Sequence, residues 1–80
     1  MASEKVEALT KADILRREKS FRWNRALPKW TFVINGRELP VRPFVLEAAG
    51  VPPNDPTNSH QAVAKLKSFG LEVCYQGKPV

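Results

Sequence analysis

This chain has little of what enzymes use for covalent chemistry. Its 80 residues include one cysteine, Cys74, and one histidine, His60, fourteen positions apart. A cysteine nucleophile needs a histidine base within hydrogen-bond reach and a group that stabilises the oxyanion. No third residue is placed to orient this pair, and a lone cysteine cannot form the disulfides that support small secreted domains.

Metal-ligand clusters and paired carboxylates are also missing. No cysteine and histidine residues occur at the spacing of a zinc site, and the four glycines fall at expected turns and helix ends instead of in a phosphate-binding loop. Four acids are scattered over different expected elements: Glu38, Glu47, Asp55 and Glu72. The sequence therefore predicts a protein that is not an enzyme, with no catalytic residue, no metal and no cofactor.

Long apolar runs are absent too. No stretch approaches the length of about 18 residues that spans a bilayer, and the opening residues M-A-S-E-K-V lack the apolar segment of a signal peptide. With a single cysteine, these features predict a cytoplasmic protein without a membrane partner. Eighty residues, 42% of them hydrophobic, are enough for one small domain.

Acidic residues are scarce in one segment only. The net charge is +5, and residues 16–30 carry all of this excess, because six basic side chains there face Glu18 alone. Phe21 and Trp23 alternate with two of the arginines, and arginine outnumbers lysine by four to two. Such a cluster repels itself unless anions neutralise it, so it is typical of a segment that binds phosphates. Arginine also suits forked contacts to phosphates and base edges.

The clearest structural signal is Asn35-Gly36, which lies between two apolar runs in residues 30–41. Asn and Gly accept the positive φ angles of a two-residue hairpin turn. The turn predicts pairing of Ile34 with Arg37, of Val33 with Glu38 and of Phe32 with Leu39. Strand alternation then places an apolar set on one face, with Arg37 at its rim. That set is Trp30, Phe32, Ile34, Leu39 and Val41.

Helices are expected on both sides of this hairpin. Thr10 and Asp13 predict a capping box that opens a helix over residues 11–19, whereas residues 1–8 are expected to fray. Arg42-Pro43 should open a short apolar helix that ends at Gly50. After a loop with three prolines, a last helix should run from residue 58 or 59 to 69.

The chain should close with a strand over residues 71–75. The expected order is therefore α-β-β-α-α-β, a small α+β domain of two layers. The hairpin and the last strand would form a three-stranded antiparallel sheet covered by the two central helices. Residues 1–29 would be an N-terminal helix with a basic-aromatic arm, and residues 30–80 the compact part of a single domain.

The start of the last helix is a second candidate contact. Asn58, Ser59, His60 and Gln61 form a polar cluster, with Lys65 one turn further on. A helix N-terminus of this kind can present donors to phosphates or base edges. Ordinary N-capping by Asn58 and Gln61 is the alternative.

Two runs carry a resemblance to known proteins. INGRELPVRPFVLEAAG (34–50) and TNSHQAVAKLKSFGLEV (57–73) resemble small modules found beside HNH-type restriction endonucleases, over about residues 32–73. Those modules share a hairpin with a Pro-x-Lys/Arg step, a short helix, a polar loop and a helix ending in Leu-Gly-Phe-x-Val. Here Pro40-Val41-Arg42 and Phe69-Gly70-Leu71-Glu72-Val73 occupy those places, without a nuclease domain. The second half is also similar to a winged helix-turn-helix, with residues 71–80 as the wing and a longer turn. Both resemblances imply DNA contact.

Together these features predict a nucleic-acid-binding module, with DNA preferred over RNA and the oligomeric state left open. The alternative is an adaptor or small inhibitor that docks on an acidic protein surface, because Trp and Arg are frequent interface hot spots. The expected contacts are Arg16, Arg17, Lys19, Arg22, Trp23, Arg25, Lys29, Arg37, Arg42, Asn58, Ser59, His60, Gln61 and Lys65.

Overall fold

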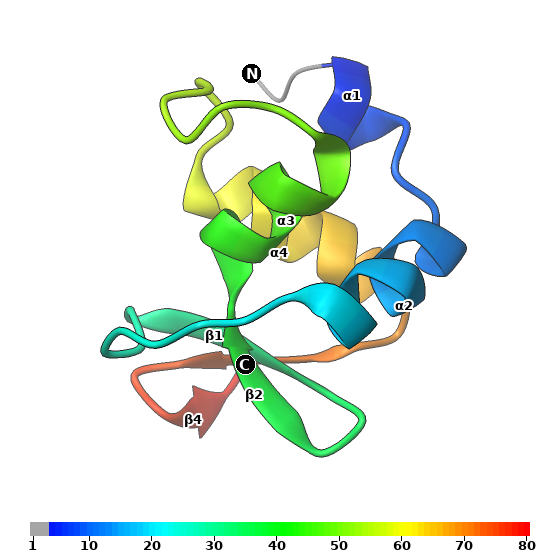
Figure 1. Cartoon of the computed structure of the whole chain (residues 1–80). Coiled ribbons are helices and arrows are strands. Elements are labelled where there is room, and N and C mark those ends of the chain that lie inside the picture. The colour runs from blue at the N-terminus through cyan, green and yellow to red at the C-terminus, as the bar shows by residue number, and fades with distance from the viewer. Residues whose placement is uncertain (1–3) are drawn as a thin grey trace.

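The computed structural model of the chain describes residues 4–80. It confirms the α+β class, with helices packed on one side of an antiparallel sheet (Figure 1). The elements in chain order are α1 (Glu4–Glu7), α2 (Lys11–Ser20), β1 (Trp30–Ile34), β2 (Arg37–Pro40), α3 (Val41–Ala49), α4 (Ser59–Ser68), β3 (Glu72–Tyr75) and β4 (Lys78–Pro79).

The hairpin forms as its turn residues require. Asn35 and Gly36 have φ angles of 50° and 77°, which are the positive values of a type I′ turn. Ile34 pairs with Arg37 and Phe32 with Leu39, so the predicted register is confirmed. Phe32, Ile34 and Leu39 are all buried.

The sheet has four strands in the order β2-β1-β3-β4, so the expected three-stranded sheet is wrong in this detail. The chain turns at Gln76 and Gly77, both at positive φ, and Lys78 pairs with Tyr75. A two-residue strand that contains Pro79 carries no readable alternation, which is why the sequence pattern missed β4.

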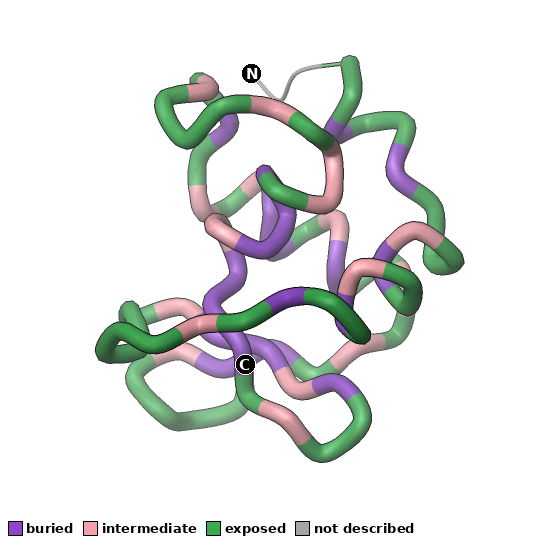
Figure 2. Tube along the Cα trace, in the orientation of Figure 1, coloured by how far each residue is buried: buried purple, intermediate pink, exposed green. Residues whose placement is uncertain are grey.

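Helices α3 and α4 cover the apolar face of the sheet, as expected (Figures 1 and 2). Phe44 of α3 is fully buried, and its ring meets those of Phe32 and Phe21 edge-on, each at 5.0 Å between centroids. Among the described residues, every buried side-chain nitrogen or oxygen has a hydrogen-bond partner. The interior is therefore an ordinary apolar core, and functional groups must be sought on the surface.

The helix ends follow local chemistry. Reciprocal capping boxes open α2 at Thr10 and Asp13 and open α4 at Asn58 and Gln61. Helix α3 begins at Val41, two residues before the expected Pro43. Proline is tolerated there because the first four N–H groups of a helix have no intrahelical partner.

The N-terminal segment differs from expectation. Residues 4–7 form α1, and Val6 is 1% exposed in the core. Lys65 Nζ donates a 2.6 Å hydrogen bond to the carbonyl oxygen of Glu7. This part of the segment expected to fray is thus held by an apolar anchor and by a contact from α4.

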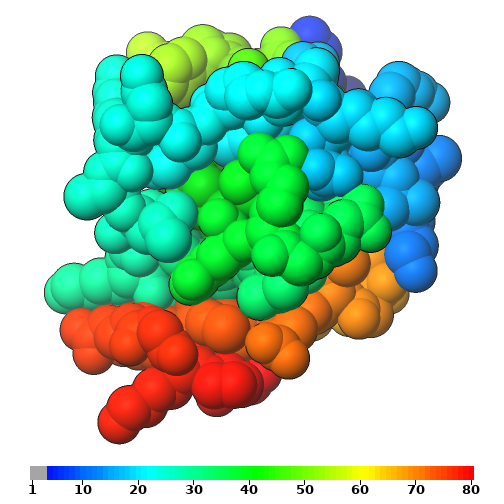
Figure 3. All heavy atoms as spheres, turned by 60° about the horizontal axis from the view of Figure 1, so that its bottom comes forward, coloured from blue at the N-terminus to red at the C-terminus, as the bar shows by residue number. Residues whose placement is uncertain are grey.

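Residues 21–29, called the arm below, have no regular structure and cross from α2 to β1. The tube in Figure 2 shows this stretch as mostly exposed, apart from Phe21 and Trp23. In Figure 3 the arm is a continuous cyan band that crosses the molecule beside the green hairpin. Phe21 is 4% exposed and fixes one end of the arm in the core, while Trp30 packs partly against the core at the other.

Candidate nucleic-acid interface

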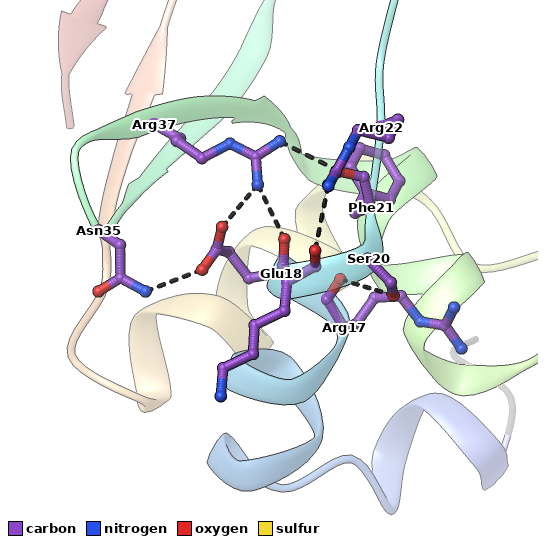
Figure 4. A network of polar contacts seen from close by, with 8 residues as sticks. Arg17, Glu18, Ser20, Phe21, Arg22, Asn35 and Arg37 are labelled. Carbon is purple, nitrogen blue, oxygen red and sulfur yellow. Dashed lines mark hydrogen bonds and ion pairs between the residues drawn. The ribbon is translucent and has the colours of Figure 1, made fainter.

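Glu18, the single acid of the basic segment, fastens α2 to the hairpin (Figure 4). Its carboxylate accepts a 2.9 Å hydrogen bond from Asn35 and a 2.5 Å charged one from Arg37. These two contacts, first the hydrogen bond of Asn35 and then that of Arg37, hold the pKa of Glu18 below its usual range. Sequence reasoning missed this role, although a lone acid among six cations is a natural candidate for a buried counter-ion.

Arg37 therefore serves the fold. Besides the Glu18 carboxylate, its guanidinium donates to the carbonyl oxygens of Glu18 (2.8 Å) and Phe21 (3.1 Å). Its charge is paired within the protein, so we leave Arg37 out of the interface that the sequence assigned it to.

Three hollows lie along the arm and helices α2 and α3. The Trp23 groove, about 520 Å³, has Trp23, Arg22 and Arg25 on the arm side. Arg42, Leu46 and Glu47 of α3 face them, and Phe21, Asn24, Pro43, Val51 and Pro53 complete the lining. Its size is that of a typical small-ligand pocket.

The Trp30 groove, about 390 Å³, adjoins the first, since Arg42 and Pro43 line both. Lys29, Trp30 and Ser59 contribute to it as well. Ser59 is the first residue of α4, so the structure brings the arm and the start of the last helix to one region.

A smaller hollow of about 160 Å³ lies between α2 and α3. Arg16, Arg17 and Asp13 line it, together with Ala48, the residue that follows Glu47 of the Trp23 groove. The three hollows place six basic side chains against two carboxylates, Asp13 and Glu47. We call this set the basic face: Arg16, Arg17, Arg22, Arg25, Lys29 and Arg42.

Most charges of the basic face remain unneutralised. Its one ion pair, among the described residues, joins Arg16 to Asp13 at 3.4 Å, and such exposed pairs contribute at most about 1 kcal/mol. Arg22 donates to the carbonyl oxygens of Lys19 and Phe21 at the end of α2. Its charge also acts on the nearby carboxylate of Glu18, which is paired directly with Arg37, so within residues 4–80 Arg22 has no ion-pair partner of its own.

Arg42 has the same character. Its Nε donates to the carbonyl oxygen of Thr57 at 2.8 Å, and its Nη2 donates to those of Pro53 (3.2 Å) and Asp55 (2.8 Å). The side chain thereby holds the proline-rich loop against α3. It keeps its positive charge at the junction of the two grooves.

Trp23 is the aromatic of the first groove. It is half-buried, its Nε1 donates to the carbonyl oxygen of Ala26 at 3.4 Å, and its ring lies parallel to that of Phe21 within 10°. The guanidinium of Arg25 lies over the indole at 5.7 Å from the centroid. An exposed cation–π contact contributes only about 0.5–1 kcal/mol, so Arg25 can exchange it for a stronger ligand.

At the start of α4, the polar side chains divide between capping the helix and lining a groove. The side-chain oxygens of Asn58 and Gln61 accept from each other's backbone N–H at 2.9 and 3.0 Å, which is the capping alternative. His60 is exposed and meets the ring of Trp30 edge-on at 5.7 Å. Of this polar cluster, only Ser59 lines a hollow described above.

The two remaining sequence-assigned lysines lie apart from the basic face. Lys65 contacts Glu7, and its ammonium lies over the ring of Phe69 at 5.6 Å. Lys19 is exposed and lines none of the three hollows. Conversely, the sequence did not indicate the groove walls that α3 and its following loop supply.

Residues 4–80 show no assembled site for other kinds of chemistry. This part of the chain holds no cluster of three or more metal-ligating side chains. None of its helices has the length and hydropathy needed to span a membrane. Cys74 is buried, and this burial raises the pKa of its thiol, with the nearby carboxylate of Glu72 acting in the same direction.

The basic face is thus the most developed surface feature of the described residues. It combines two connected grooves, six cations and a half-buried aromatic ring. No protein-family model, curated protein or solved structure matches this chain.

Proposed function

We propose that this chain is a small nucleic-acid-binding module, with DNA as the preferred ligand, and that the basic face contacts the phosphates. One observation carries the proposal. Basic side chains from three separate segments, α2, the arm and α3, line three hollows that contain only two carboxylates, and two of these hollows share Arg42 and Pro43.

Binding by such a face is driven by the release of counterions from the nucleic acid. Each neutralised phosphate of a duplex contributes about −0.9 to the slope of log K against log salt. If all six basic side chains engage phosphates, the slope is about −5. Arginines in this set add forked hydrogen bonds that a lysine cannot make.

The test compares two double variants with the same change in net charge. Arg25→Gln with Lys29→Gln removes two charges from the basic face, and Lys67→Gln with Lys78→Gln removes two from α4 and β4. All four side chains are exposed, and none donates a hydrogen bond within residues 4–80, so both variants should fold.

Affinity for a fluorescent DNA duplex is measured over a series of salt concentrations. We expect the first variant to lose about two units of slope and the second to retain the wild-type slope. Equal losses in the two variants would refute the assignment to this face. A flat salt dependence of the wild type would refute nucleic-acid binding and favour an acidic protein as the partner.

A further inference from the structure

The Trp23 groove has an aromatic wall, which phosphate binding alone would not use. Its wall is an indole ring, half-buried and parallel to the Phe21 ring. Arg22 and Arg25 of the arm and Arg42 of α3 line the same groove, and the guanidinium of Arg25 lies over the ring. A flat aromatic ring beside several cations is the arrangement that single-strand-binding proteins use, with bases stacked on the ring and phosphates on the cations.

We propose that the Trp23 groove binds a base of single-stranded nucleic acid, with the flanking phosphates held by the arginines around it. The proposal rests on the nucleic-acid-binding function above and specifies the form of the ligand. The shared chemistry is a stacked base between two phosphates, which either DNA or RNA can supply.

The recessed position of Trp23 argues for a single strand. In a duplex the flat faces of the bases are covered by their neighbours, so a half-buried indole inside a groove cannot reach them. An unpaired base can enter the groove and continue the parallel pair of Phe21 and Trp23.

An entering base would displace the guanidinium of Arg25 from the indole ring. This guanidinium now lies over the indole, where the base would stack. A base takes this place because stacking on an aromatic ring is stronger than an exposed cation–π contact. The displaced guanidinium remains on the arm and pairs with the adjacent phosphate.

The neighbouring Trp30 groove extends the path. Arg42 lies between the two grooves, and Lys29 and the second tryptophan line the far one. A strand can therefore run from Trp23 past Arg42 to Trp30 and alternate between cationic and aromatic contacts. The aromatic interleaving of the basic segment thereby becomes a succession of sites along one route.

The experiment measures affinities at one salt concentration for three probes of equal length: an oligothymidylate, an oligouridylate and a DNA duplex. We expect at least one single strand to bind about tenfold or more tightly than the duplex and to quench tryptophan fluorescence. Trp23→Ala should weaken single-strand binding by about tenfold, within the range of stacking losses. It should leave duplex binding nearly unchanged.

Two further variants keep the test decisive. Trp23→Phe retains a stacking ring and should keep most of the affinity while losing the quenching, which assigns the signal to Trp23 instead of Trp30. Leu27→Ala alters an exposed apolar residue of the arm outside the grooves and should leave the affinity for all three probes unchanged.

Different results would refute the stacking inference and the nucleic-acid-binding function. A duplex that binds as tightly as the single strands, or single-strand binding unaffected by Trp23→Ala, would overturn the stacking inference and leave nucleic-acid binding intact. Absence of binding to all three probes would overturn both. A preference between the two single strands identifies DNA or RNA as the source of the base.

Discussion

Replacing Arg42 by methionine tests whether this side chain holds the loop over residues 51–58. The guanidinium makes three hydrogen bonds to backbone carbonyl oxygens of that loop. The bonds to Thr57 and Asp55, both 2.8 Å, are partly buried, whereas the bond to Pro53 is longer and exposed. Methionine keeps an unbranched apolar stem but has no donor, so it removes all three bonds while filling part of the same space.

The expected loss follows from the two partly buried bonds. A hydrogen bond with a charged partner contributes about 1.5–3 kcal/mol, so at the lower value the variant loses about 3 kcal/mol of unfolding free energy. A domain of this size has about 4–12 kcal/mol in total. The corresponding fall in Tm is about 12–24 °C.

Urea unfolding followed by circular dichroism measures the loss, and amide hydrogen exchange reports on residues 51–58. Arg42→Lys is the matched control, because it keeps the charge but lacks the forked donors. We expect it to lose about half as much, since one carbonyl can still be reached. Full stability of the lysine variant, or a methionine variant within about 0.5 kcal/mol of wild type, would refute the hydrogen-bond account.

The remaining predictions concern the fold. Because the contacts of Glu18 lower its pKa, the stability it provides is complete above its ordinary pKa and is lost on acidification. Glu18→Gln should therefore flatten the decline of unfolding free energy that sets in as the pH falls below about 5, and an unchanged decline would contradict this. Burial raises the pKa of Cys74, so its thiol should react with iodoacetamide at pH 7.5 far more slowly in the native protein than in urea; equal rates would refute this. Val6→Ala should lower the unfolding free energy measured in urea by about 2 kcal/mol, because apolar burial is lost and a cavity is left. If the segment frayed instead, the substitution would leave the unfolding free energy unchanged. Gly50→Ala should cost about 1 kcal/mol, because Gly50 has a φ of 72°; a neutral effect would mean that the helix end rearranges.

Features that depend on near neighbours were predictable from the sequence. The Asn35-Gly36 turn, both capping boxes and the helix end at Gly50 formed where they were expected. Each relies on backbone preferences or on partners within a few residues, so the chemistry is complete within a short window of the chain. The covering of the hairpin by two helices followed from the apolar pattern of these elements.

The assignment of individual charges was not predictable, because their partners are distant in sequence. Arg37 pairs with Glu18, 19 residues away, and Lys65 bonds to Glu7, 58 residues away. Neither spacing leaves a periodic signal. From the sequence, both cations were predicted to contact nucleic acid. In the fold they instead fasten α2 and α1 to the rest of the domain.

The sequence by itself thus determined the class of fold, the hairpin register and the excess of positive charge in residues 16–30. The tertiary structure decided which of these charges are neutralised and which line a groove. The physical reason is that a groove needs two walls. The arm supplies one wall and α3 with its following loop supplies the other, and only packing around the buried Phe21 and Phe44 brings them together.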